Sequence, residues 1–303
     1  MDLRPKVAIV GMGKVGGTLA YSLAARGIAR ELVLIRRTLE KARADEADLR
    51  HALGGGGRVD VRAGTLESAA GADIVVLAAD ARKGPIQDRR ELIADNVALM
   101  REIVPPLVKA APGAIYVVAT NPVDVTAWHV LRLGGLDAPK VISSGTVLDT
   151  MRLRCAVARR AGVPADEVEG YAVGEHGDRV VVAWSTVKVR GREPDGVDRE
   201  DVVREVRDAG MRIYKTKGGS VFGICESLVR IVEALSCGEG RVLTVSTLLT
   251  GVKEVQGVFL SVPCLLGRSG VEVVSPPELT PDELREFRES AQRVLIVAET
   301  ASG

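Results

Sequence analysis

The 303-residue sequence lacks an excess of charge of either sign, since 41 basic and 40 acidic residues leave a formal net charge of +1. These charges are scattered, so the basic surface pattern of proteins that bind nucleic acid or anionic membranes is missing. The sequence also lacks a signal-peptide pattern and any apolar run long enough to span a membrane. We therefore expect a cytoplasmic protein whose partner is a small molecule.

Cysteine is scarce, and the four cysteines lie far apart in the sequence, at Cys155, Cys225, Cys237 and Cys264. None of them forms the paired spacing of a metal site, so the sequence predicts no bound metal. Apolar residues surround them, which favours buried free thiols in a reducing compartment. Hydrophobic residues make up 46% of the chain and can form a large core.

The first half alternates short apolar runs, rich in Val and Ile, with segments of helical periodicity. This order is typical of a doubly wound parallel sheet with helices on both faces. The expected strands are KVAIV, ELVLI, DIVVLAA, AIYVVAT and KVIS, and the expected helices between them are 14–26, 38–52, 89–110 and 123–133.

The second half has a different order and is predicted to be an α+β domain. Its expected helices cover 147–161, 198–216 and 219–235, and its strand-like runs are YAV, VVVAWSTVKV, VLTVSTLL and VFLSV. A last helix is expected to open at Thr280-Pro281-Asp282-Glu283. We place the domain boundary between residues 144 and 145, giving domains 1–144 and 145–303.

A glycine-rich segment, Gly11-Met12-Gly13-Lys14-Val15-Gly16, joins the first expected strand to the first helix. Such glycines allow a tight turn, a close approach of the backbone to a pyrophosphate and close helix packing, while the helix N-terminus offers free N–H groups. A plain glycine turn is the alternative. Within a βαβ unit the pattern favours a dinucleotide-binding Rossmann domain, with Gly11, Gly13 and Gly16 at the phosphates.

The second expected strand ends where NAD-binding proteins have a carboxylate for the adenosine ribose. This sequence has Arg36, followed by Arg37 and Thr38. A guanidinium can pair with a 2′-phosphate and a hydroxyl can donate to it, so the sequence favours NADP(H), with NAD(H) as the alternative. The two arginines could instead simply solvate the strand end.

One of only three histidines, His176, stands in Gly174-Glu175-His176-Gly177-Asp178 after an expected strand. An imidazole titrates near neutrality, so it can give a proton to a carbonyl oxygen as hydride arrives and take it back in reverse. A turn residue without a catalytic role is the alternative. His51 and His129 fall inside helical patterns and are interpreted as structural.

Asp149 and Arg152 lie three residues apart at the start of the long second-half helix, and therefore near one face of it. They could form a simple local ion pair. Alternatively, the carboxylate could orient a histidine while the guanidinium binds a substrate carboxylate through two parallel hydrogen bonds. The spacing leaves both interpretations open.

Five motifs occur together: GxGxxG, Asn121-Pro122-Val123-Asp124, SGTVLDTMR, GEHGD and Lys217-Gly218-Gly219-Ser220. In this order and at these separations they resemble the lactate/malate dehydrogenase family of L-2-hydroxy acid dehydrogenases, over essentially the whole chain. The resemblance implies that His176 donates and accepts the proton, that Asp149 is its partner and that Arg152 binds the substrate carboxylate. It further implies that Asn121 lies near the reacting oxygen and the nicotinamide, and that Ser220 lines the pocket.

The resemblance also implies a mobile loop whose arginine, here Arg89 with Arg90 adjacent, polarises the substrate carbonyl. An earlier loop position selects the substrate in the family, with glutamine for pyruvate and arginine for oxaloacetate. Lys83 occupies it in a gapless alignment and Arg82 does so after one insertion. A cation there favours an acidic tail, so malate/oxaloacetate is predicted ahead of lactate/pyruvate or another acidic 2-oxo acid. A solvated loop tip is the alternative.

The main hypothesis is therefore an NADP-preferring L-2-hydroxy acid dehydrogenase. An alternative of another class is a non-catalytic nucleotide-binding protein, although such a protein would not need the full set of candidate catalytic residues. Because the family forms dimers and tetramers, we also expect a homodimer or homotetramer.

Overall fold

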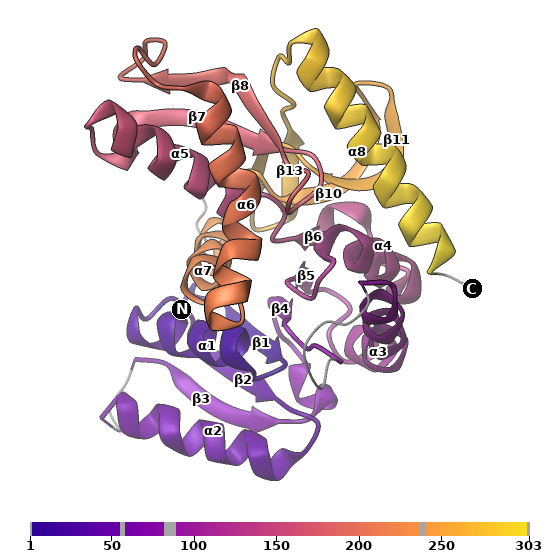
Figure 1. The fold of residues 1–303 in the computed structure, drawn as a ribbon. Coiled ribbons are helices and arrows are strands. Elements are labelled where there is room, and N and C mark those ends of the chain that lie inside the picture. Colours follow the sequence, from indigo (N-terminus) through magenta and orange to yellow (C-terminus); the bar gives the residue numbers. More distant parts are fainter. Residues whose placement is uncertain (1, 55–57, 82–88, 237–239, 302–303) are drawn as a thin grey trace.

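The structure is a computed structural model that describes residues 2–54, 58–81, 89–236 and 240–301, with the backbone alone for 89–91. Its largest sheet has eight strands in the order β11-β10-β6-β5-β4-β1-β2-β3 (Figure 1). The parallel part consists of β1 (Lys6–Val10), β2 (Glu31–Ile35), β3 (Asp60–Gly64), β4 (Ile74–Leu77), β5 (Ile115–Val118) and β6 (Val141–Ser143).

Helices connect these parallel strands, as the alternating sequence pattern predicts. They are α1 (Lys14–Ala25), α2 (Leu39–Ala52), α3 (Arg89–Ala110) and α4 (Val123–Gly134), with short 3-10 helices η1 (Leu66–Ala69) and η2 (Ala138–Lys140). All four residues of β4 and of β5 are buried, because helices leave neither face of the central strands to solvent. The strand order reverses between β1 and β4, which places a ligand crevice at the carboxyl ends of these strands.

The second half contributes five helical segments and the remaining strands. Its helices are α5 (Val147–Ala161), η3 (Ala165–Glu167), α6 (Arg199–Lys217), α7 (Phe222–Ser236) and α8 (Pro281–Thr300). Its strands are β7 (Val168–Val173), β8 (Val181–Val189), β9 (Arg241–Leu243), β10 (Ser246–Val252), β11 (Val255–Ser261), β12 (Cys264–Gly267) and β13 (Gly270–Val274). The predicted fold class is confirmed: a Rossmann sheet is followed by a mixed α/β half.

The two halves share the large sheet. The antiparallel hairpin β10–β11 belongs to the second half, yet β10 pairs with β6 through Ser246 and Ser143. One hydrophobic cluster also includes side chains from both halves, such as Leu34 and Phe287. The boundary that we predicted lies between β6 and α5, and the pairing of β10 with β6 joins the two sides of it in one sheet.

Three features of the fold were not expected from the sequence. β3 reads DVRAG, with Asp60 and Arg62 exposed and Val61 buried, so a strand at the sheet edge has too few apolar side chains to form a recognisable run. The run VLTVSTLL, expected as one strand, is divided between β9 and β10, which belong to different sheets. The sheet β13-β12-β9 was not predicted.

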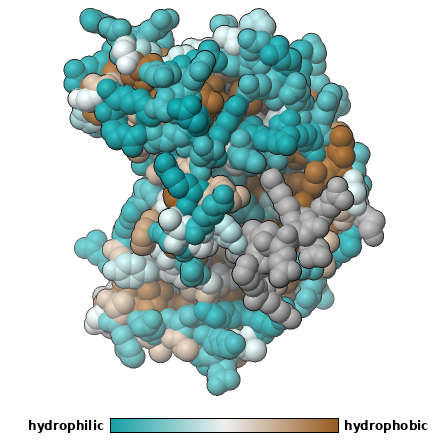
Figure 2. All heavy atoms as spheres, in the orientation of Figure 1, coloured by the Kyte–Doolittle hydropathy of each residue, from teal (hydrophilic) through white to brown (hydrophobic). Residues whose placement is uncertain are grey.

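The surface agrees in part with the predictions from composition. Hydrophilic side chains cover most of the face in Figure 2, which is hollowed between the part with β7 and β8 and the part with α1 and α2. Among the described residues, no helix is long and apolar enough to cross a membrane.

The cysteines were predicted to be buried free thiols. Cys225 and Cys264 are buried and free, but the prediction of burial was wrong for Cys155, which is exposed on α5. Cys237 lies outside the described residues.

Candidate active site

The glycine-rich segment has the geometry of a phosphate loop. Gly11 has φ of +99°, and a Cβ there would lie 2.4 Å from the backbone N of Ala79. A Cβ on Gly16 would lie 1.9 Å from the carbonyl oxygen of Gly11, so packing within the protein requires both glycines. A Cβ on Gly13 would meet nothing within 4 Å, which leaves open space at the N-terminus of α1.

The start of α1 is suited to an anion. Gly13 is its N-cap and provides no side-chain cap, and the first turn of α1 contains no acidic residue. The N–H groups of a helix start and the positive end of its dipole favour a phosphate at this place. These residues fit the pyrophosphate of a dinucleotide, and the binding of phosphates at Gly11, Gly13 and Gly16 stays a prediction.

Arg36 at the end of β2 has protein partners that the sequence did not predict. Arg36 donates from Nε and Nη2 to the carboxylate of Asp45, with Nη2 lying 3.2 Å from Oδ1, and Nη2 also donates to the carbonyl oxygen of Met12. Arg37 and Thr38 are exposed. Sequence reasoning missed Asp45 because it stands nine residues beyond Arg36, on α2.

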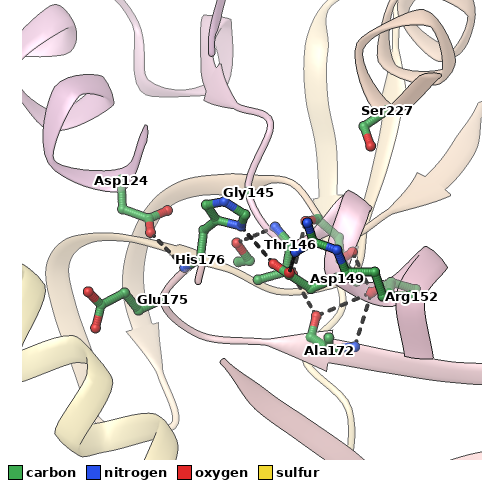
Figure 3. A network of polar contacts seen from close by, with 12 residues as sticks. Asp124, Gly145, Thr146, Asp149, Arg152, Ala172, Glu175, His176 and Ser227 are labelled. Carbon is green, nitrogen blue, oxygen red and sulfur yellow. Dashed lines mark hydrogen bonds and ion pairs between the residues drawn. The ribbon is translucent and has the colours of Figure 1, made fainter. Parts of the chain in front are cut away.

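A histidine and a buried carboxylate meet at the end of β7. Nδ1 of His176 lies 2.7 Å from Oδ2 of Asp149 on α5. Both residues are drawn in the polar network of Figure 3. The Asp149 side chain is fully buried, whereas 22% of the His176 side chain is exposed. This geometry leaves the imidazole accessible while its carboxylate partner is shielded from water.

Charges fix the protonation of this pair. Burial alone would lower the pKa of His176, but the negative charge of Asp149 and the hydrogen bond to it outweigh burial and raise that pKa above its ordinary value. Burial alone would raise the pKa of Asp149, but His176 and Arg152 outweigh it and lower that pKa. The pair therefore favours an ionised carboxylate beside a protonated imidazole.

Arg152 joins the same cluster. Its Nη1 donates to Oδ1 of Asp149 at 2.8 Å, and its Nη2 donates to Oγ of Ser220 at 3.2 Å. The two interpretations of Asp149 and Arg152 left open by the sequence are thus compatible, because Asp149 binds the arginine with one oxygen and the histidine with the other. Only 14% of the Arg152 side chain is exposed.

A polar network holds α5 against β7. Thr146 Oγ1 donates to the carbonyl oxygen of Ala172 (Figure 3). The backbone N–H of Ala172 donates to Thr150 Oγ1 at 3.0 Å. Gly145 has φ of +47°, and a Cβ there would lie 2.5 Å from the backbone N of Ser246. These contacts position Asp149 relative to His176, and the sequence reasoning did not find them.

A second carboxylate faces His176 from α4. The backbone N–H of His176 donates to Oδ2 of Asp124 at 3.0 Å (Figure 3). Burial raises the pKa of Asp124 to about 6, against the opposing effects of this hydrogen bond and of nearby His176. The motif containing Asp124 was recognised in the sequence, but no role was predicted for this residue.

The remaining candidate residues differ in what the structure describes. Asn121 is exposed just after β5, and its carbonyl oxygen accepts a hydrogen bond from Asn96 Nδ2 at 2.8 Å. Arg89 begins α3, but its side chain is not among the described ones. Arg82 and Lys83 lie outside the described residues.

The other two histidines lie apart from the cluster. His129 on α4 is buried, with its ring centroid 5.1 Å from that of Trp128, and burial, assisted by the charge of Arg101, lowers its pKa to about 4. His51 is exposed near the end of α2. The described residues include no group of three or more His, Cys, Asp or Glu that could hold a metal ion.

Comparison with known families agrees with this geometry. Residues 5–143 match the lactate/malate dehydrogenase NAD binding domain, and residues 146–301 match the lactate/malate dehydrogenase alpha/beta C-terminal domain. The chain belongs to the lactate/malate dehydrogenase family. The family resemblance read from the motifs is confirmed, and the protein is an oxidoreductase of this family with a domain for a nicotinamide dinucleotide.

Similar proteins cover nearly the whole chain. The L-lactate dehydrogenase of Thermus aquaticus is 39% identical over 298 residues, which are 95% of this chain and 96% of the relative. That of Thermoanaerobacter sp. (strain X514) is 35% identical with the same coverage. Among solved structures, the minor L-lactate dehydrogenase from Enterococcus mundtii has a TM-score of 0.93 and 34% identity, and covers 99% of both chains.

Proposed function

We propose that this protein interconverts an L-2-hydroxy acid and its 2-oxo acid, with His176 as the proton donor and acceptor. The observation that carries this proposal is the position of Asp149, whose two carboxylate oxygens contact His176 and Arg152 separately. A bound nicotinamide would supply or accept the hydride. The side chains of this chain would bind the acid and transfer the proton.

In the direction of reduction, the steps follow from the charges of the cluster. Ionised Asp149, protonated His176 and Arg152 together carry one net positive charge, which suits a substrate with one carboxylate. Arg152 would bind that carboxylate, with Ser220 beside it. Protonated His176 would then give its proton from Nε2 to the carbonyl oxygen, since Nδ1 faces Asp149. Asn121 and Arg89 are proposed to assist at the same oxygen.

The cofactor choice lies between two nucleotides. NADP(H) is the candidate that the sequence favours, because Arg36, Arg37 and Thr38 stand where a ribose carboxylate is usual. NAD(H) is the second candidate, since Arg36 is already paired with Asp45 and the matching domain is described as NAD binding. Comparing kcat/KM for NADPH and NADH decides between them, and a preference for NADH would reject the NADP(H) proposal.

The substrate tail is proposed to be acidic. Arg82 or Lys83 would be left without a partner by the methyl group of pyruvate, which favours oxaloacetate/malate. Pyruvate/lactate is the second candidate, because the relatives compared above are named L-lactate dehydrogenases. Another acidic 2-oxo acid could pair with the same side chain, Arg82 or Lys83.

One matrix of assays tests these proposals together. Oxaloacetate, pyruvate and longer 2-oxo acids are each combined with NADH and with NADPH, and oxidation of the nucleotide is followed by absorbance. We expect turnover with oxaloacetate above that with pyruvate. Equal or better activity on pyruvate would reject the role of Arg82 or Lys83, whereas no turnover with any 2-oxo acid would reject the proposed reaction.

The assembly is proposed to be a homodimer or homotetramer, as the family resemblance implies. Sedimentation velocity of the purified chain, whose monomer mass is 32.1 kDa, measures this directly. A monomer at assay concentration would reject the proposal without affecting the proposed chemistry.

A further inference from the structure

We propose that Asp45 sets the balance between NADH and NADPH by holding the guanidinium of Arg36. The inference deepens the proposed function, because it concerns the ribose end of the same dinucleotide site. Asp45 belongs to α2 rather than to the strand end where a ribose carboxylate is usually found.

The Arg36 guanidinium is engaged on one of its two binding edges. An arginine binds an oxyanion bidentately through a pair of neighbouring N–H groups. Arg36 uses the Nε and Nη2 edge for Asp45, and the same Nη2 also donates to the carbonyl oxygen of Met12 inside the glycine-rich segment. A phosphate that approached Arg36 would therefore find this edge occupied.

The charges at this edge nearly cancel. Asp45 neutralises Arg36 and would repel a 2′-phosphate bound beside it, whereas an unmodified ribose hydroxyl could donate to its carboxylate. Asp45 thus brings to this edge the carboxylate that the end of β2 lacks. Arg36 then holds this carboxylate and does not bind a phosphate, so the inference favours NAD(H), the second candidate above, for the unmodified protein.

The pair is exposed enough to be exchanged. The side chains of Arg36 and Asp45 are 33% and 27% exposed, and ion pairs of this kind contribute little to folding stability. Arg36 can therefore change partner when the competing carboxylate is removed. A purely structural pair, which only ties α2 to the glycine-rich segment, would instead affect both nucleotides equally.

The test compares Asp45→Asn with Asp48→Asn, which removes the same charge from an exposed position of the same helix. Binding of NADH and NADPH is measured by nicotinamide fluorescence at low ionic strength, and melting temperatures confirm folding. We expect Asp45→Asn to shift the ratio of the two Kd values toward NADPH on the order of tenfold, the worth of one charge-assisted hydrogen bond. Asp48→Asn is expected to leave the ratio within about twofold, because exposed charges are screened.

A second pair of probes separates this inference from the proposed reaction. 2′,5′-ADP and 5′-AMP differ in the phosphates on the ribose and lack the nicotinamide, so their binding does not depend on any turnover. We expect Asp45→Asn and Asp45→Ala to tighten 2′,5′-ADP selectively. An equal change for both probes, or a shift equal to that of Asp48→Asn, would overturn the proposal.

The role of Arg36 is tested by repeating Asp45→Asn in an Arg36→Gln background. If Asp45 acts by holding Arg36, most of the gain in NADPH binding should disappear in that background. A gain of the same size without Arg36 would overturn the holding mechanism.

Discussion

The molecule contains two aspartate–arginine pairs at opposite ends of the proposed dinucleotide and substrate sites, and they differ in burial. Asp149 is fully buried and Arg152 is 14% exposed, whereas Asp45 and Arg36 are each about a third exposed. The buried pair also contacts His176 and Ser220. Burial suits the first pair to the proposed proton-transfer site, while exposure suits the second to the proposed exchange of partners.

The buried pair is stable only as a set. Removing a carboxylate from water is costly unless charged groups and hydrogen bonds compensate for it. Asp149 has two such partners, Arg152 and His176, one on each oxygen. Loss of any member leaves another charge without its partner in a region with little water, whereas water can replace a lost partner at Asp45.

The largest effect is expected from His176→Asn. The amide of Asn cannot act as a general acid or base at neutral pH, so kcat should fall by about 10²- to 10⁴-fold, the usual range for loss of a general acid. Nucleotide binding should be retained, because the contacts described for His176 are with Asp149 and Asp124 and not with the glycine-rich segment. The measurement is steady-state turnover with the best 2-oxo acid, alongside fluorescence titration of the nucleotide. Retained kcat would remove His176 from the mechanism.

Asp149→Asn is expected to damage both activity and stability. A neutral amide does not stabilise the protonated form of His176, and the guanidinium of Arg152 loses its buried counter-ion. The free energy of unfolding should therefore fall by about 3–5 kcal/mol. Urea denaturation measures this. The matched change, Asp45→Asn, should cost less than about 1 kcal/mol because its pair is partly exposed. Equal losses of unfolding free energy in Asp149→Asn and Asp45→Asn would contradict the claim that burial distinguishes the two pairs.

The pH dependence of stability follows from the same pair. Because the pKa of His176 is raised, its stabilising contribution is complete below its ordinary value of about 6.5 and is lost as pH rises through its folded-state value. The pKa of Asp149 is lowered, so its contribution is present above its ordinary value and is lost as pH falls through its folded-state value. In Asp149→Asn the free energy of unfolding should therefore depend less on pH, both where His176 loses its proton and where Asp149 would gain one.

Arg152→Lys should weaken substrate binding more than nucleotide binding. A lysine keeps the positive charge but loses the two parallel hydrogen bonds, so KM for the 2-oxo acid should rise about 10- to 100-fold. The variant Arg160→Lys, which changes an arginine that pairs with Asp201 and Glu205, serves as a control. Equal KM changes in the two variants would argue against a carboxylate-binding role for Arg152.

Asp124→Asn should have the smallest effect of these changes. The amide oxygen can still accept the backbone N–H of His176, but the negative charge that helps to raise the pKa of His176 disappears. The fall of kcat/KM for reduction at high pH should begin at a lower pH, with less than about a tenfold loss at neutrality. An unchanged pH profile would show that Asp124 serves only as a backbone anchor.

The sequence predicted most of what depends on short motifs and buried strands. Its glycine spacing predicted the tight turn between β1 and α1, and the central strands were found because they are apolar on both faces. His176, Asp149, Arg152 and Ser220 were predicted together, and the structure brings them together. Their roles in catalysis stay predictions.

What the sequence did not reveal depends on contacts between distant segments. Nothing in the pattern of α2 distinguishes Asp45 from its acidic neighbours, because only the fold brings it to Arg36. Thr146 and Ala172 likewise meet only when α5 packs against β7. The edge strand β3 has too few apolar residues to differ from a loop.

The central claim is that the charge of ionised Asp149, and the hydrogen bond to it, keep a proton on His176 against the opposing effect of burial. The most direct test is a pH titration of the three imidazoles by NMR, with His176→Asn and His129→Asn used to assign the signals. The claim predicts that His176 stays protonated to a pH above its ordinary value of about 6.5, while His129 titrates near 4. A His176 that titrates at or below its ordinary value would contradict it.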